Sequence, residues 1–165
     1  MVPNIKFSTI FSSLPKELVK KLDKTYSEIK NNFLHRRYEP SELNGAKFCE
    51  VVFRILEWYT STRYTPLGTQ IKNFGQSTRK FENMINFSDS IRFHIPKILN
   101  ALYDIRNKRG VGHVGGDVDP NHMDAVFVVS ACDWIMCELV RIFHGVTIEE
   151  AQKIVENLID KKIPL

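Results

Sequence analysis

Apolar residues recur at helical spacing along nearly the whole chain, and this periodicity constrains the fold more than any other feature. In residues 13–36, Leu18, Leu22, Ile29 and Phe33 fall on one face of a 3.6-residue helix. The same pattern continues further along the chain, and we expect additional helices over residues 41–60, 76–85, 88–108 and 119–145 and from residue 147 onward. The sequence therefore predicts an all-α bundle of about five to six helices.

Two of these helices carry clear signals at their ends. Asp119 followed by Pro120 predicts a helix start, with the aspartate as the N-cap and the proline in the first helical position. Gly145 predicts the end of the same helix. Thr147 and Glu150 have the spacing of a capping box, which predicts the start of the last helix.

The chain is expected to form a single domain, because 165 residues can bury a core without crosslinks. We divide it into an N-terminal arm (1–12), a helical bundle (13–145) and a C-terminal segment (146–165). This last segment holds the capped helix, and its apolar ending favours the start of a further segment. The proline and glycines of residues 61–75 predict a long loop or a hairpin-like excursion. Pro96 predicts either a kink or the first turn of the second half of its helix.

Composition narrows the class of protein. The formal charge of +4 and a pI near 9.0 suit a polyanionic partner such as nucleic acid, although inert surfaces carry similar charges. Cys49, Cys132 and Cys137 lie in apolar runs without zinc-site spacing, which predicts buried reduced thiols and no metal site. The sequence shows neither a signal peptide nor a stretch of membrane-spanning length, so we expect a cytoplasmic protein that does not contact a membrane.

The segment RNKRGVGHVGGDVDPNH (106–122) places basic residues, histidines and glycines between two apolar helices. Residues 110–115 match the GxGxxG pattern of dinucleotide-binding proteins. That fingerprint requires a β-strand before it, whereas a helix is expected here, so we reject a dinucleotide site. The glycines either form a simple turn or let the main chain approach a phosphate; on the second reading Gly112 and Gly115 contact the substrate.

Arg106 falls on the apolar stripe of its helix, because Leu99 and Leu102 precede it by seven and four residues. An unpaired buried charge is costly, so an arginine at this position needs an explanation. It can reach water beyond the helix end or form an ion pair, for example with Glu50 or Asp104. It can also be functional.

His113 favours the functional interpretation. It lies seven residues beyond Arg106, just past the expected helix end, so both side chains can converge on one pocket. Histidine titrates near neutral pH, while arginine stays charged and binds phosphate in a bidentate manner. Lys108 and Arg109 are candidate contacts to flanking phosphates, or simply a basic helix end that suits the helix dipole.

Arg106 and Asn107, followed by KRGVG and His113 at the end of a long helix, resemble the R(N/D/H)x4–6H signature of the HEPN superfamily. The most similar subtype is that of the abortive-infection C-terminal-like proteins, whose motif is RNxxGxxHG. This chain reads RNKRGVGHVGG and departs from that spacing by the additional Val114. The resemblance covers about residues 40–145.

The resemblance implies a HEPN-like bundle that forms a homodimer and, in active members, a metal-independent endoribonuclease that uses no cofactor. Such proteins act in toxin systems, phage defence and RNA processing, which implies RNA as a partner and allows for an antitoxin or sensor partner. RNA cleavage by its 2′-hydroxyl requires a base, an acid and a cation. His113 would be the base or acid, Arg106 would stabilise the phosphate, and Asn107 would orient the histidine or hold the arginine.

Two other interpretations use the same residues. The chain can be a non-catalytic HEPN-like module that binds RNA or a nucleotide or mediates assembly. Alternatively, the Arg/His pair can serve only a dimer interface, where a two-fold axis brings the two copies together. Asp117 and Asp119 would permit a metal site near the loop, but the role of Asp119 as a helix cap is the better explanation.

Overall fold

The computed structural model describes residues 5–108 and 118–160. These residues form seven α-helices, one 3-10 helix, one π-helical turn and no β-strand, which confirms the all-α class. The α-helices are α1 (Phe7–Ile10), α2 (Lys16–Leu34), α3 (Tyr38–Ser61), α4 (Phe74–Thr78), α5 (Ile95–Lys108), α6 (His122–His144) and α7 (Ile148–Asp160). The 3-10 helix is η1 (Arg79–Asn83), and the π-helical turn is η2 (Ser90–His94).

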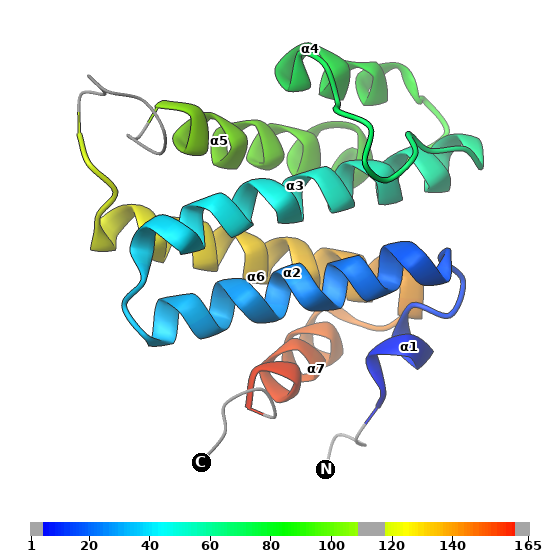
Figure 1. Cartoon of the computed structure of the whole chain (residues 1–165). Coiled ribbons are helices and arrows are strands. Elements are labelled where there is room, and N and C mark those ends of the chain that lie inside the picture. The colour runs from blue at the N-terminus through cyan, green and yellow to red at the C-terminus, as the bar shows by residue number, and fades with distance from the viewer. Residues whose placement is uncertain (1–4, 109–117, 161–165) are drawn as a thin grey trace.

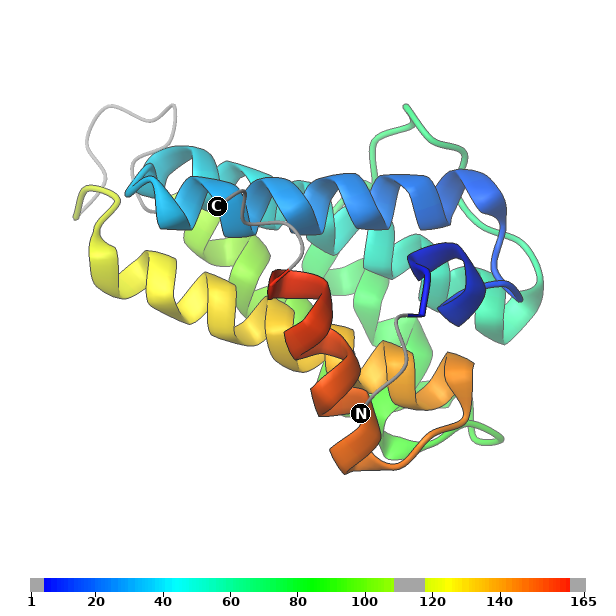
Figure 2. The same ribbon diagram turned by 90° about the horizontal axis from the view of Figure 1, so that it is seen from below.

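Four long helices, α2, α3, α5 and α6, lie side by side and form the body of the molecule (Figure 1). Helix α4 packs against α5 on one side, while α1 and α7 lie on the opposite side, where α7 crosses α6 (Figures 1 and 2). The apolar stripes of the long helices meet in one core. Its fully buried members include Leu22, Ile29, Val52, Ile55, Leu99, Ile135 and Leu139.

The capping box at the start of α7 is confirmed. The Thr147 amide donates to Oε2 of Glu150 over 3.0 Å, and the Glu150 amide donates to Oγ1 of Thr147 over 3.2 Å. Gly145 ends α6 in the left-handed conformation with φ of 64°, as predicted. These local signals correctly place the turn between the last two helices.

The expected N-cap of α6 at Asp119 is wrong. The helix begins two residues later than expected, and the cap is Asn121, whose Oδ1 accepts a hydrogen bond from the Asp124 amide over 3.1 Å. The Asn121 side chain also donates to the Asp119 carbonyl over 3.1 Å. Both residue types are good N-caps, and the asparagine satisfies the helix amide while also tying down the preceding turn.

Two other helix boundaries differ from the expectation. Helix α3 starts at Tyr38 and includes Pro40 in its first turn, where the missing amide costs nothing because the first amides of a helix have no intrahelical acceptor. The helix expected over 76–85 is divided into α4 and η1, and α4 starts earlier because Oδ1 of Asn73 accepts from the Gln76 amide.

Pro96 lies in the first turn of α5, directly after the π-helical turn η2. The second of the two alternatives for this proline is therefore the one observed. The chain is helical on both sides of this proline, and the π-helical turn lies where its missing amide interrupts the regular hydrogen-bond pattern. From this point α5 continues without interruption to Lys108 and carries Arg106 in its last turn.

The loop that follows α3 (62–73) is held by two buried charged side chains of that helix. The Arg54 side chain is 3% exposed, and its guanidinium donates over 2.7–3.2 Å to main-chain carbonyls. These carbonyls belong to Glu50, Thr65, Pro66 and Thr69. Glu57 accepts from the Thr65 amide over 3.0 Å and from Lys80 over 2.7 Å. The loop therefore has a defined position beside α3 and α5.

Helices α2 and α6 are joined by a polar cluster at the edge of the core. The Tyr26 hydroxyl donates to Oδ1 of Asp133 over 2.6 Å, and Lys30 forms an ion pair with the same carboxylate over 2.9 Å. Burial, together with the adjacent Asp133 charge, raises the pKa of Tyr26 well above its usual range. The cluster fixes how these two helices meet.

Candidate functional site

Arg106 extends the buried face of α5 to the end of the helix. Leu99 and Leu102, on the same stripe, are completely buried, while Arg106 is half-buried in the last turn. The apolar stripe thus carries the base of the arginine side chain into the fold, and the guanidinium lies where the stripe reaches the surface.

The Arg106 guanidinium is held by its neighbour in the chain. Its Nη1 donates to Oδ1 of Asn107 over 2.9 Å, whereas its Nε is buried and has no hydrogen-bond partner among the described residues. The partner of the guanidinium is thus a neutral amide. The ion pair with Glu50 that the sequence allowed is not formed among the described residues. A buried N–H without an acceptor costs about 1–3 kcal/mol, so it is rarely left in a stable fold without a reason.

Arg106 and Asn107 line a surface pocket of about 690 Å³ between α5 and the segment around α4. One wall is an aromatic pair, Phe74 of α4 and Tyr103 of α5, whose rings stack with centroids 4.2 Å apart and planes 12° apart. Burial and the nearby Glu50 carboxylate raise the pKa of Tyr103, and the Arg106 charge opposes this shift. The pocket therefore combines a rigid apolar wall with a cation.

Asn100 carries the second buried polar atom without a partner in the described part of the chain. Its Nδ2 donates to Oγ1 of Thr78 over 2.7 Å, and this fixes the amide so that Oδ1 has no donor. Asn100 lines the same pocket as Arg106. The two unsatisfied atoms found in the described residues, one donor and one acceptor, thus belong to two residues that line the same pocket.

This arrangement suits a ligand that carries a negative charge. The Arg106 guanidinium, with the exposed Arg79 on the same pocket, provides positive charge for a phosphate. A single carboxylate, Asp104, also lines the pocket, so its lining keeps an excess of positive charge.

Several residues assigned to the site from the sequence lie outside the described structure. These are Arg109, Gly112, His113 and Gly115, and the side chain of Lys108 belongs with them. Asn107 lies beside Arg106 and contacts it, which matches one of the two roles considered for it. The structure thus brings Arg106 and Asn107 together.

The sequence interpretation missed Asn100, Tyr103 and Phe74. For the two residues on α5 a signal was available, because Asn100, Tyr103 and Asn107 recur three and four residues apart and so share one face. No comparable signal existed for Phe74, since it reaches the pocket through the path of a loop some thirty residues earlier in the chain.

The remaining sequence expectations concern thiols, metals and membranes. Cys49 and Cys132 are buried free thiols, and Cys137 is partly buried. Within residues 5–108 and 118–160, no group of three His, Cys, Asp or Glu side chains is arranged to hold a metal ion. The helices in these ranges include none that is both long and apolar enough to cross a bilayer.

Comparison of the chain with protein-family models, curated protein sequences and solved structures found no match. The class that the structure defines is a helical bundle with a cationic, aromatic-walled pocket at the end of α5.

Proposed function

We propose that this protein is a metal-independent endoribonuclease of the HEPN type, in which Arg106 and His113 form the catalytic pair. The observation that carries the proposal is the position of the Arg106 guanidinium, which Asn107 holds at the end of α5 in a pocket whose lining carries an excess of positive charge. A guanidinium held in this way suits bidentate binding of a phosphate. RNA supplies both a phosphate and a 2′-hydroxyl.

In this mechanism, His113 removes the proton of the 2′-hydroxyl, or protonates the leaving oxygen from the second copy of the chain. Arg106 stabilises the charge that grows on the phosphate, and Asn107 holds its guanidinium in position. Lys108 and Arg109 contact flanking phosphates, while Gly112 and Gly115 allow the main chain to approach the substrate.

A second copy of the chain has a suitable surface on α6. Large apolar side chains on one face of this helix are 39–69% exposed and recur three, four and seven residues apart. They are Met123, Val126, Phe127 and Trp134. An isologous contact through this face would bury the stripe against the same stripe of the second copy.

The direct test is incubation of the purified protein with total RNA in the presence of a chelator. We expect wild type to release fragments with 2′,3′-cyclic phosphate ends, and Arg106→Ala and His113→Ala each to abolish them while the protein stays folded. Arg63→Ala and His35→Ala, which change exposed residues outside the pocket, serve as matched controls. Cleavage that survives both active-site substitutions, or that requires a divalent metal, would contradict the proposal.

The second candidate is a non-catalytic HEPN-like module that binds RNA or a nucleotide. The cationic pocket supports it equally, because Arg106 would bind the phosphate of a ligand whether or not that ligand is cleaved. Salt-sensitive RNA binding without cyclic phosphate products would favour this candidate. A role in phage defence or in a toxin system, with an antitoxin or sensor partner, rests on the family resemblance and remains part of the proposal.

A further inference from the structure

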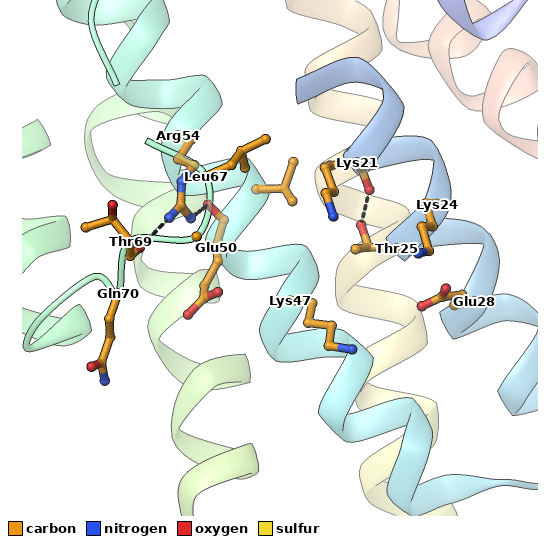
Figure 3. Close-up of a pocket in the computed structure, with 12 residues that line it drawn as sticks. Lys21, Lys24, Thr25, Glu28, Lys47, Glu50, Arg54, Leu67, Thr69 and Gln70 are labelled. Atoms are coloured by element: carbon orange, nitrogen blue, oxygen red, sulfur yellow. Dashed lines mark hydrogen bonds between the residues drawn. The ribbon is translucent and has the colours of Figure 1, made fainter. Parts of the chain in front are cut away.

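A second pocket of about 430 Å³ lies beside the first, between α2, α3 and the loop that follows α3 (Figure 3). Gln70 of this loop lines both pockets. The loop therefore separates two neighbouring cavities, and a chain-like ligand can pass from one to the other along its edge.

The second pocket is lined by exposed lysines from two helices. Lys21 and Lys24 come from α2, and Lys47 extends from α3 towards α2 (Figure 3). In the described part of the chain none of the three forms an ion pair, whereas Lys30 and Lys80 pair with carboxylates elsewhere. Three ammonium groups that line one pocket, and that form no ion pair among the described residues, are available to an anion.

Two carboxylates, Glu28 and Glu50, also line the pocket. Glu50 points to the side of Gln70, away from Lys47, and its Oε1 lies 3.5 Å from the Tyr103 hydroxyl (Figure 3). Glu28 lies on α2, one turn beyond Lys24. With Arg54 included, four cationic side chains face two carboxylates, so the pocket keeps an excess of positive charge.

The wall of this pocket is rigid. The buried Arg54 guanidinium donates only to main-chain carbonyls, three of which belong to the loop that carries Gln70. Its charge is therefore satisfied by dipoles and is not cancelled by a carboxylate, so it adds to the positive potential of the pocket. A preformed wall lowers the entropic cost of ligand binding.

We propose that the pocket lined by Lys21, Lys24 and Lys47 binds the phosphate backbone of the RNA strand whose scissile phosphate lies at Arg106. This inference rests on the proposed function and adds a path for the substrate. The strand leaves the first pocket past Gln70 and crosses α3 to reach the lysines. Contacts of this kind position the strand without reading its sequence.

A third pocket also adjoins the first and shares Arg79 and Asn100 with it, but its other two cations, Arg92 and Lys97, already have contacts within the chain. Arg92 donates to the Glu82 carbonyl over 2.7 and 3.0 Å, and Lys97 lies over the Phe93 ring at 5.7 Å. The strand therefore runs towards the lysines of α2 and α3.

The test measures binding of a single-stranded 2′-O-methyl RNA oligonucleotide, which cannot be cleaved by 2′-hydroxyl attack, by fluorescence anisotropy over a range of salt concentrations. The charge reversal Lys21→Glu with Lys47→Glu is expected to weaken binding at least tenfold. Affinity should also depend less steeply on salt: the negative slope of log affinity against log salt should become smaller in magnitude by about 0.7 for each lysine. The matched control, Lys6→Glu with Lys153→Glu, changes the same charge on exposed lysines at the start of α1 and in α7, outside all three pockets, and should stay within twofold of wild type.

If the charge-reversal variant fails to fold, Lys21→Gln with Lys47→Gln provides the same comparison, with a smaller expected loss of affinity. Equal losses in the lysine and control variants, or an oligonucleotide that does not bind at all, would overturn the inference. So would displacement of the oligonucleotide by millimolar inorganic phosphate alone, because that outcome would show a site for a small anion. If wild type cleaves RNA but the lysine variants bind the oligonucleotide as well as wild type does, only this inference is overturned. If binding depends on the lysines but wild type does not cleave RNA, only the proposed catalysis is overturned.

Discussion

Arg106 and Asn107 are consecutive residues of α5 whose side chains contact each other, with Nη1 of the arginine 2.9 Å from Oδ1 of the asparagine. This contact fixes the guanidinium but leaves its Nε buried without an acceptor in the described structure. The arginine is thus held in a defined orientation at a cost in stability of about 1–3 kcal/mol.

The first prediction concerns the balance between stability and activity at Arg106. Arg106→Met keeps the aliphatic part of the side chain and removes the unsatisfied donor, so the free energy of unfolding should stay unchanged or rise by about 1 kcal/mol. RNA cleavage should fall by about 10²–10³-fold, as expected for the loss of a charge-stabilising donor. Urea denaturation and a cleavage assay on the same preparation check both parts, and a large loss of stability would identify Arg106 as a structural residue.

The second prediction concerns the loop that forms the wall between the two pockets. Arg54→Met removes donors to four loop and helix carbonyls, and we expect the free energy of unfolding to fall by about 2–4 kcal/mol. Hydrogen exchange should accelerate most in residues 62–70. Arg63→Ala, an exposed substitution in the same loop, is the control and should change stability by less than about 0.5 kcal/mol.

The sequence predicted the helical class, the position of Arg106 on the apolar stripe and the capping box of α7, because each depends on residues within two turns of one helix. It did not predict that Phe74 would lie against Tyr103, since this contact depends on the path of a loop. Nor did it predict the role of Arg54, because its acceptors are main-chain carbonyls, which every residue carries.

The third prediction concerns pH. The Tyr26 hydroxyl is neutral in the folded state and its pKa is raised by burial and by Asp133, while a tyrosine in the unfolded chain ionises near pH 10. Its contribution to stability is therefore present below about pH 10 and is lost as the pH rises further. Tyr26→Phe should lower the free energy of unfolding at pH 7 by about 1–3 kcal/mol and should make the alkaline loss shallower.

Urea unfolding curves between pH 7 and 11 provide the measurement for Tyr26. Tyr59→Phe alters an exposed tyrosine of α3 and should leave the curves unchanged. An alkaline loss of stability equal in wild type and Tyr26→Phe would assign the pH dependence to other groups.

The fourth prediction concerns thiol reactivity. Burial raises the pKa of Cys49 and Cys132 well above the usual range, and burial together with nearby carboxylates raises that of Cys137 to about 11. At pH 8 we expect a thiol reagent to modify native Cys137 slowly and the other two hardly at all, whereas urea should expose all three cysteines. Peptide mapping of the labelled protein identifies the sites, and rapid labelling of native Cys132 would contradict the burial.

The fifth prediction concerns self-association through α6. Phe127→Glu with Trp134→Glu places two charges in the exposed apolar stripe, and we expect a dimer of wild type to become a monomer without loss of helical content. Sedimentation equilibrium provides the measurement, and Ser130→Glu alone should weaken the dimer less. If wild type is a monomer at all concentrations, the dimeric form of the proposed catalytic site is wrong.

The contact between Tyr26 and Asp133 also has a consequence for the order of folding. It joins residues 107 positions apart, whereas α2 and α3 are consecutive and can pair as soon as both have formed. Closing the longer loop costs more entropy, so we expect docking of α6 on α2 to follow formation of the α2–α3 pair. A contact made after the rate-limiting step slows unfolding without accelerating folding. This polar cluster would therefore stabilise the folded bundle mainly by lowering its unfolding rate.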